Sequence, residues 1–151
     1  MGTRSLTFVY DEKYGRRKPK AIINMYRQYD GYPTGHGAEL AKFLAPFEMV
    51  SGIPVGQATE RKMANGMGCL AAQLVSNFKV EAGQFYLYPT SAIDCGQDYE
   101  YHIYTKDGAL RVGITNRGCN FFGLTQSDTN EKIFDGNLTE FTKFCTEKET
   151  A

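Results

Sequence analysis

The sequence predicts an α+β fold, with an antiparallel sheet and about three helices packed mainly on one face of it. Segments that alternate apolar and polar residues predict strands, and segments with apolar residues every three or four positions predict helices. Along the chain they come in the order strand, strand, helix, helix, several strands, helix, which favours helices gathered on one side of a sheet. The length of 151 residues predicts a single domain over 1–151, and the tail after about residue 146 is a candidate for disorder.

The N-terminal part of the chain predicts a hairpin followed by a helix. Strands are expected at 5–10 and 21–27, where Thr, Val, Ile, Phe and Tyr are frequent. The polar loop from Asp11 to Lys20 separates them, so the two strands are expected to pair antiparallel. A first helix is expected to start near Gly37 or Ala38, because apolar residues then recur at helical spacing at Leu40, Phe43, Leu44 and Phe47.

The middle of the chain predicts a second helix and a short strand. The segment Asn65-Gly66-Met67-Gly68 is a glycine-rich entrance, and the helix is expected from about Cys69 to Lys79. Gly83 is expected to end that segment. A short strand follows from Phe85 to Tyr88 and stops at Pro89, which cannot continue a ladder of backbone hydrogen bonds. The apolar stripe of the helix is Leu70, Leu74, Val75 and Phe78.

The C-terminal part of the chain predicts a second hairpin and a last helix. Strands at 99–105 and 110–115 alternate cleanly and flank Asp107-Gly108, a pair that strongly favours a tight hairpin turn. The last helix is expected from Leu138 to about Lys148. Asn137 precedes it as N-cap, and Glu140 stands three residues on, as in a capping box.

The composition narrows the classes of function. Lysine and arginine together number 17, as do aspartate and glutamate, and this balance argues against general nucleic-acid binding. No stretch approaches the roughly 18 apolar residues of a membrane span. The four cysteines lie far apart without a Cys-x-x-Cys pair, so neither a metal site nor a cofactor is predicted. We expect a cytoplasmic protein with reduced thiols, in the host cytoplasm if the gene is carried by a phage.

The loop from Tyr26 to Gly37 carries the densest set of candidate binding residues. It joins a strand end to a helix start, and a helix N-terminus presents free backbone N–H groups that bind anions. Arg27 is expected to clamp a phosphate or a carboxylate, with His36 donating to the same ligand. Tyr29 and Tyr32 are expected to stack on its ring. The predicted ligand-binding residues are Arg4, Arg27, Tyr29, Asp30, Tyr32, Gly35, His36, Gly37, Asn65 and Gly66.

Asn65 and Gly66 enter this set because they open the second predicted helix, and Arg4 because it precedes the first predicted strand. Two glycine-rich helix entrances in one small domain could converge on a single anionic ligand. A second interpretation stays open, because Asp30-Gly31 and Pro33 are ordinary turn residues and the glycines of both entrances can serve close packing alone.

These residues favour non-enzymatic binding of a small anionic, nucleotide-like ligand, because no catalytic signature accompanies them. Two alternatives remain. His36 and Asp30 can act as the acid–base pair of a phosphoester hydrolase. A sheet edge or the tyrosine-rich surface can instead make the chain a protein–protein adaptor, and the abundance of aromatic residues is also compatible with a homo-oligomer.

The opening Met1-Gly2-Thr3-Arg4-Ser5 and the run from Tyr26 to Pro33, followed by Gly35-His36-Gly37, resemble a family of small uncharacterised proteins of bacteriophages, bacteria and some fungi. The segment Asn65 to Gln73 is also similar to that family, and the hairpin around Asp107-Gly108 loosely so. The resemblance brings no established activity, and it implies that the loop residues act as a set. If the gene is viral, the role expected of a nucleotide binder is to sequester a host signalling nucleotide.

Overall fold

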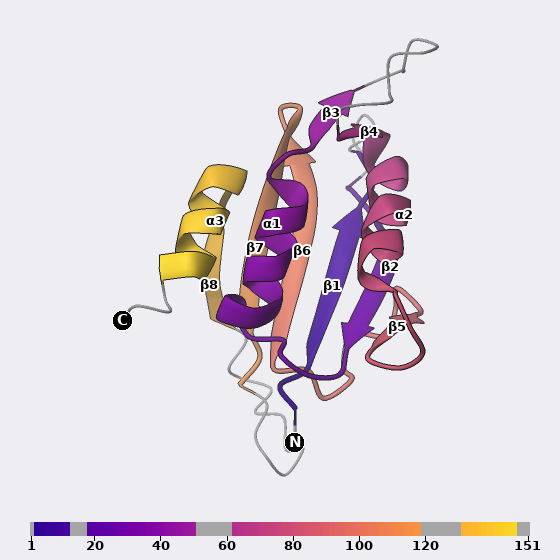
Figure 1. The fold of residues 1–151 in the computed structure, drawn as a ribbon, viewed down its shortest axis with the longest axis vertical. Coiled ribbons are helices and arrows are strands. Elements are labelled where there is room, and N and C mark those ends of the chain that lie inside the picture. The colour runs from indigo at the N-terminus through magenta and orange to yellow at the C-terminus, as the bar shows by residue number, and fades with distance from the viewer. Residues whose placement is uncertain (1, 13–17, 51–61, 119–130, 148–151) are drawn as a thin grey trace.

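The computed structural model describes residues 2–12, 18–50, 62–118 and 131–147. Six strands form one sheet in the order β5-β2-β1-β6-β7-β8 (Figure 1). Neighbouring strands pair antiparallel, except that β1 and β6 at the centre run parallel. The α+β prediction is confirmed, and the sheet is mixed because of this one pair. The strands are β1 (Ser5–Tyr10), β2 (Ala21–Arg27), β5 (Phe85–Tyr88), β6 (Tyr99–Lys106), β7 (Ala109–Asn116) and β8 (Glu131–Asn137).

The parallel pair forms because β6 enters the sheet at the same end as β1. The backbone N–H groups of Asp98 and Tyr99 both donate to the carbonyl oxygen of Arg4, at 2.9 and 3.3 Å. The segment between β5 and β6 crosses to the far side of β1 before the chain returns to the sheet. A hairpin connection cannot produce this arrangement, and so the pattern of neighbouring strands in the sequence did not predict it.

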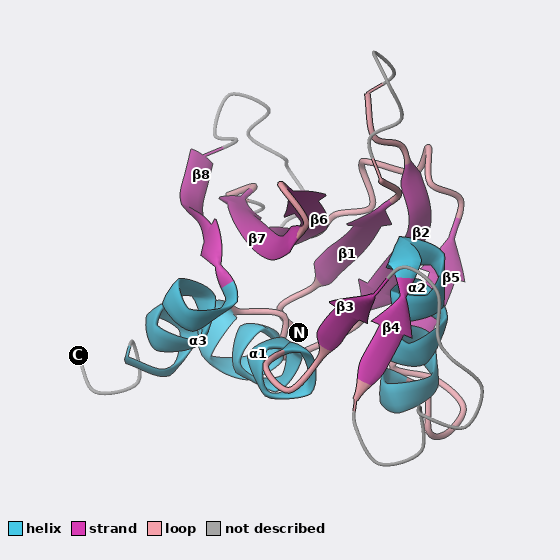
Figure 2. Ribbon diagram, turned by 90° about the horizontal axis from the view of Figure 1, so that it is seen from above, coloured by secondary structure: helices cyan, strands magenta, loops and turns pink. Residues whose placement is uncertain are grey.

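In the described part of the chain, three helices cover one face of the sheet, as the sequence predicts (Figure 2). They are α1 (Ala38–Leu44), α2 (Gly66–Phe78) and α3 (Leu138–Glu147), and one turn of π-helix, η1 (Pro33–Gly37), leads into α1. No helix among the described residues is long and apolar enough to cross a membrane. Residues 148–151, which include the end of the tail predicted to be disordered, lie outside the described residues.

Two predicted local motifs are confirmed in detail. Asp107 and Gly108 both have positive φ angles, 53° and 80°, as a tight hairpin turn between right-twisted strands requires. At α3, the side chain of Asn137 accepts from the N–H of Glu140 at 2.8 Å, and Glu140 Oε1 accepts from the N–H of Asn137 at 2.9 Å. This reciprocal pair is a capping box, and it fixes where α3 begins.

Three strands were not predicted. The edge strand β8 has a short apolar pair, Ile133-Phe134, among polar residues, which gives little alternation. The strands β3 (Glu48–Val50) and β4 (Met63–Asn65) are three residues each and pair in parallel. Such short segments carry too few residues for a period to be read from the sequence.

Each face of the sheet has its own apolar cluster. On the face covered by the helices, buried side chains of β1, β2, β6 and β7 pack against those of the three helices, and Leu40, Leu70 and Tyr101 are among the fully buried ones. On the opposite face, which we call the second face, Leu6, Phe8 and Tyr26 form a smaller cluster. The second cluster packs against Tyr10, Ala21, Tyr88 and Cys95.

Candidate functional site

Arg27 and His36, two of the predicted ligand-binding residues, meet inside the protein. Arg27 ends β2 with 4% of its surface exposed, and His36 of η1 is fully buried. Arg27 Nη1 donates to His36 Nδ1 at 3.1 Å, so the other ring nitrogen carries the proton and donates to Thr7 Oγ1 at 2.8 Å. Burial and the charge of Arg27 lower the pKa of His36 to about 3. The imidazole is therefore neutral and fixed in one tautomer.

The backbone N–H groups that lead into the N-terminus of α1 form hydrogen bonds within the protein. Those of Gly35 and Gly37 donate to the carbonyl oxygen of Tyr32, and that of His36 donates to the carbonyl oxygen of Asp30 at 2.8 Å. The prediction that these groups receive an anion is therefore corrected, because each already has an acceptor. The carbonyl groups of Asp30 and Tyr32, which come before the π-helical turn η1, are these acceptors. No feature of the sequence distinguishes that turn from an ordinary helix start.

The glycines at this mouth serve close packing. A Cβ atom on Gly35 would lie 2.6 Å from the carbonyl oxygen of Asp30, and one on Gly37 would lie 2.7 Å from the Sγ atom of Cys145. The second of these contacts brings η1 against α3. Tyr101 holds the loop from the sheet, with its hydroxyl group donating to the carbonyl oxygen of Gly31 at 2.7 Å. This geometry supports the interpretation that the glycines pack the loop rather than admit a ligand.

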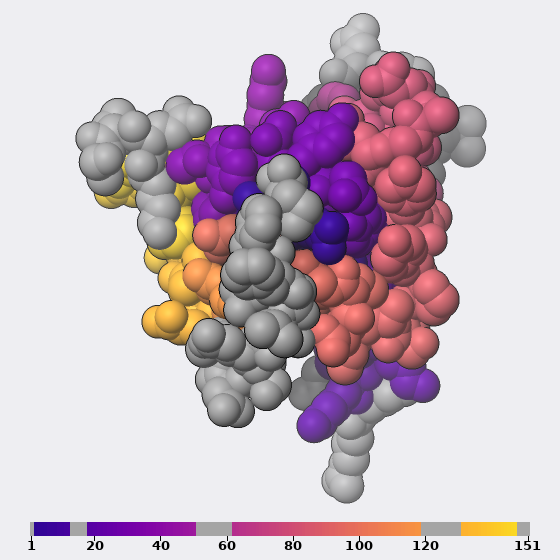
Figure 3. Space-filling view, turned by 90° about the horizontal axis from the view of Figure 1, so that it is seen from below, coloured from indigo at the N-terminus to yellow at the C-terminus, as the bar shows by residue number. Residues whose placement is uncertain are grey.

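The remaining predicted residues of the loop point in several directions. Tyr29 and Tyr32 are partly exposed, and the hydroxyl group of Tyr32 donates to Asp30 Oδ1 at 3.3 Å. The side chain of Arg4 approaches Gly96 and the ring of Tyr26, on the second face of the sheet. Arg4 therefore does not join Arg27. In the view from the end where the N-terminus lies, the N-terminal residues (indigo) sit between the purple and salmon segments of the chain (Figure 3).

The two glycine-rich helix entrances lie at opposite ends of β1. At one end, before the strand, Thr3 accepts from the N–H of Gly31. At the other end, after the strand, Glu12 Oε1 accepts from the N–H of Met67 at 2.7 Å, in the first turn of α2. Asn65 and Gly66 are at this second end, where a cleft of about 410 Å³ also includes Glu12. The two entrances therefore do not converge on one ligand, because the length of β1 separates them.

His36 and Asp30 do not form an acid–base pair. The ring nitrogens of His36 contact Thr7 and Arg27, and the Asp30 carboxylate receives the Tyr32 hydroxyl group. A fully buried imidazole with both nitrogens engaged cannot reach a substrate proton without a rearrangement of the core. The arrangement gives the hydrolase alternative no support.

A cleft of about 560 Å³ opens between α1, the end of α2 and the start of β5. This volume is within the roughly 300–1,000 Å³ range of small-molecule sites. Three phenylalanine rings line it, and two side-chain amides, Asn77 and Gln84, offer hydrogen bonds. Gln84 has a positive φ of 65°, a backbone conformation that residues other than glycine rarely adopt. The three rings are those of Phe43, Phe78 and Phe85.

Four charged side chains are among the residues that line this cleft. Lys42 of α1 and Lys62 are exposed at its rim, and Glu81 stands on the rim as well. Glu39, in the first turn of α1, lines the cleft and forms an ion pair with Arg27, whose guanidinium lies 5.0 Å from the centre of the Phe85 ring. The predicted residue Arg27 thus lies directly behind the wall of the cleft, next to two of its lining residues.

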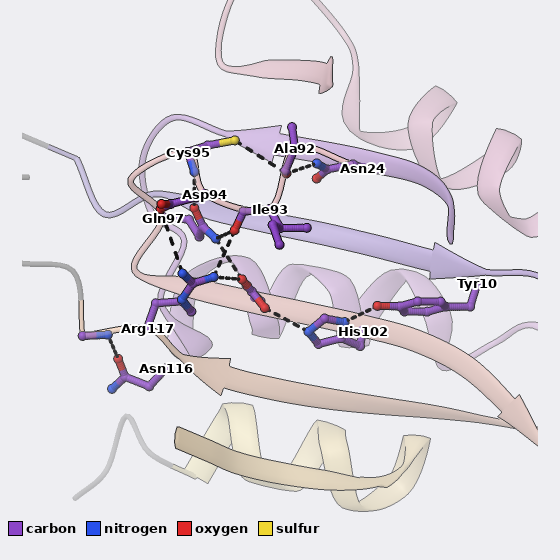
Figure 4. Close-up of polar contacts among 12 residues, drawn as sticks. Tyr10, Asn24, Ala92, Ile93, Asp94, Cys95, Gln97, His102, Asn116 and Arg117 are labelled. Carbon is purple, nitrogen blue, oxygen red and sulfur yellow. Dashed lines mark hydrogen bonds and ion pairs between the residues drawn. The ribbon is translucent and has the colours of Figure 1, made fainter. Parts of the chain in front are cut away.

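The second face of the sheet carries a separate polar network (Figure 4). The Tyr10 hydroxyl group donates to His102 Nδ1 at 2.6 Å, and His102 Nε2 donates to Glu100 Oε1 at 3.2 Å. The other carboxylate oxygen of Glu100 accepts from Gln97 at 2.8 Å and from Arg117 at 2.5 Å. Phe8 stacks on the imidazole with ring centres 5.3 Å apart.

The phenol of Tyr10, the imidazole of His102 and the carboxylate of Glu100 are hydrogen-bonded in series, which is the order of groups found in proton relays. Burial, and then the charge of Glu100, raises the pKa of Tyr10 to about 12, so the phenol stays protonated at neutral pH. Burial alone would raise the pKa of Glu100, but hydrogen bonds from His102, Gln97 and Arg117 lower it overall. The lowered pKa of Glu100 reflects hydrogen bonds that stabilise its charged form in the fold, and the raised pKa of Tyr10 does not activate the phenol as a base.

Sequence reasoning missed the residues of both the cleft and the network. Glu100 and His102 alternate on one strand, and this spacing is a signal that could have placed them together on one face. Glu39 and Lys42 stand three residues apart on α1 and share a face of that helix. No sequence signal brings Lys62 to them, because the cleft exists only where α1, α2 and β5 meet. No group of three potential metal-binding side chains is found among the described residues.

No protein-family model, curated protein or solved structure matches this chain.

Proposed function

We propose that this protein binds a small anionic, nucleotide-like ligand without transforming it, and that the ligand occupies the cleft between α1 and α2. The observation that carries the proposal is the composition of that cleft, whose lining combines three phenylalanine rings with the cationic side chains of Lys42 and Lys62. Flat rings recognise a base by apolar contact, and lysines at the rim attract phosphate. Behind the wall, Arg27 forms an ion pair with Glu39 of the lining.

Each part of the cleft has a role in the proposal. Phe78 and Phe85 contact the base, and the amides of Asn77 and Gln84 bind its polar edge. Lys42 and Lys62 bind the phosphate. Binding alone requires no catalytic group, and neither His36 nor the Tyr10–His102–Glu100 network reaches the cleft lining. If the gene is viral, such binding suits the sequestration of a host signalling nucleotide.

The test combines mass spectrometry with calorimetry. Small molecules released from the purified protein identify the ligand, and a panel of nucleoside monophosphates, diphosphates and cyclic nucleotides is titrated into the protein. We expect the double variant Lys42→Gln/Lys62→Gln to lose at least about tenfold in affinity, because two phosphate contacts are removed. The matched control is Lys143→Gln on α3, an exposed lysine away from the cleft, which should bind as the wild type does.

Two results would contradict the proposal. Equal loss of affinity in the Lys143→Gln control would show that only the overall charge matters. Recovery of a chemically altered nucleotide after incubation would show that the protein is an enzyme.

A further inference from the structure

Arg27 is a charged group that the fold holds ready for an anion. Its Nε atom donates to the carbonyl oxygen of Tyr29 at 2.7 Å, Nη1 contacts His36, and the guanidinium plane lies over the Phe85 ring. These contacts fix the side chain without neutralising its charge, because none of the three partners is an anion. Among the described residues, this rigid, buried guanidinium has one ionic partner. It is therefore preorganised to exchange that partner for another oxyanion.

The ionic partner, Glu39, is held much less firmly. Its side chain is 55% exposed, whereas that of Arg27 is 4% exposed. The ion pair joins one carboxylate oxygen to Nη1, and within the described part of the chain the hydrogen bonds of the guanidinium use only Nε and Nη1. The contact is therefore single, where an arginine–oxyanion pair of full strength is bidentate. Glu39 can swing into solvent without disturbing the core.

We propose that Glu39 stands in for the phosphate of the ligand, and that a ligand with a terminal phosphate binds by displacing Glu39 from Arg27. This inference rests on the proposed function and specifies the ligand chemistry of the same cleft. A terminal phosphate carries about −1.5 to −2 charges at neutral pH and offers three oxygens, so it can engage Nη1 and Nη2 together. Lys42, three residues after Glu39 on α1, accounts for the second charge.

The number of charges on the ligand makes the exchange selective. A phosphodiester such as a cyclic nucleotide carries one charge, like Glu39, and gains little by replacing it. Glu81 on the rim repels any anion that enters, and contacts with both Arg27 and Lys42 must offset this repulsion. The proposal therefore predicts that a nucleoside monophosphate binds more tightly than the corresponding 3′,5′-cyclic nucleotide.

The test uses inorganic phosphate as the probe and removes the internal competitor. Thermal unfolding is followed as phosphate is added at constant ionic strength to the wild type, to Glu39→Gln and to Glu81→Gln. Without phosphate, we expect Glu39→Gln to unfold at a lower temperature, because Arg27 has lost its ionic partner. With phosphate, it should be stabilised with an apparent dissociation constant at least about tenfold lower than that of the wild type.

Glu81→Gln is the matched control, because it removes the same charge from the same cleft without touching Arg27. It should gain much less phosphate affinity than Glu39→Gln. An equal gain in both variants, or no gain in Glu39→Gln, would overturn the displacement of Glu39.

Failure of the exchange and failure of the proposed function are distinguishable. If Glu39→Gln binds phosphate as expected but no nucleotide binds wild type or variant, the anion site stands and the proposed function is wrong. If a nucleoside monophosphate binds wild type and Glu39→Gln with equal affinity, binding in the cleft stands and the exchange is wrong.

Discussion

His36 shows how burial at a single residue makes the stability of the protein depend on pH. Its pKa is near 6.5 when the chain is unfolded and about 3 in the fold, where burial and Arg27 oppose protonation. Above pH 6.5 the ring is neutral in both the folded and the unfolded state, so His36 makes little contribution to the pH dependence of the free energy of unfolding. As pH falls below 6.5, the unfolded chain takes up a proton that the fold refuses, so stability is lost until pH reaches about 3.

We predict that His36 alone lowers the free energy of unfolding by about 2 kcal/mol between pH 7 and pH 5. Urea unfolding at both pH values measures the change, and His36→Gln should show a smaller one because it cannot titrate. NMR of the wild-type imidazole provides an independent check that does not require the variant to fold. A ring that becomes protonated near pH 6 would contradict the prediction.

Glu100 makes stability depend on pH in the same direction, but through its charged form and at lower pH. Its lowered pKa means that the folded carboxylate is stabilised above the ordinary pKa of glutamate, and that this stability is lost as pH falls through that range. We predict that Glu100→Gln costs about 1–3 kcal/mol at pH 7, since Arg117 and His102 lose a charged acceptor. The difference between wild type and variant should shrink at pH 3.

The control for Glu100 is Asp135→Asn at the neighbouring part of the sheet. Asp135 also receives a tyrosine hydroxyl group and faces an arginine, but its side chain is 30% exposed, against 12% for Glu100. Its loss should cost at most about 1 kcal/mol. Equal costs measured by urea unfolding for both variants would show that burial of Glu100 is not what makes its contacts matter.

At the scale of elements, Gly37 and Gly68 are expected to respond in opposite ways to substitution by alanine. A Cβ atom on Gly37 would lie 2.7 Å from Cys145 Sγ of α3, whereas one on Gly68 of α2 would meet no atom within 4 Å. We predict that Gly37→Ala lowers stability by about 1–3 kcal/mol through this clash. Gly68→Ala should raise stability by roughly 0.5–1 kcal/mol, because alanine is the better helix former.

A double-mutant cycle with Cys145→Ala identifies the cause. If the Sγ contact is responsible, Gly37→Ala should cost clearly less in the Cys145→Ala background than in the wild type. An unchanged cost would place the effect elsewhere in the packing of η1 against α3. Thermal unfolding of the four proteins is sufficient for the comparison.

At the scale of the whole molecule, the order of the strands sets which parts of the sheet open first. The strands β1 and β6 are central and have partners on both sides, while β5 lies at one edge and has four residues. We predict that the backbone amides of β1 and β6 exchange with deuterium at least about tenfold more slowly than those of β5, because edge strands open locally. Equal protection in all three strands would contradict this order of stability.

The sequence by itself determined the local structure of this protein. The Asp107-Gly108 turn, the capping box of Asn137 and Glu140 and the apolar stripes of α1 and α2 depend on residues a few positions apart. Such neighbours constrain one another whatever the rest of the chain does. The sequence also placed Arg27 and His36 among the candidate binding residues, although it put them at an open helix mouth.

The tertiary structure alone decided what these residues do. Sheet pairing puts Thr7 beside His36, and the packing of α1 on the sheet puts Glu39 on Arg27. A charge or an N–H group is available to a ligand only if no distant residue of the chain already pairs with it. Those partners are set by the parallel pairing of β1 and β6 and by the contacts of three helices, none of which has a local signature.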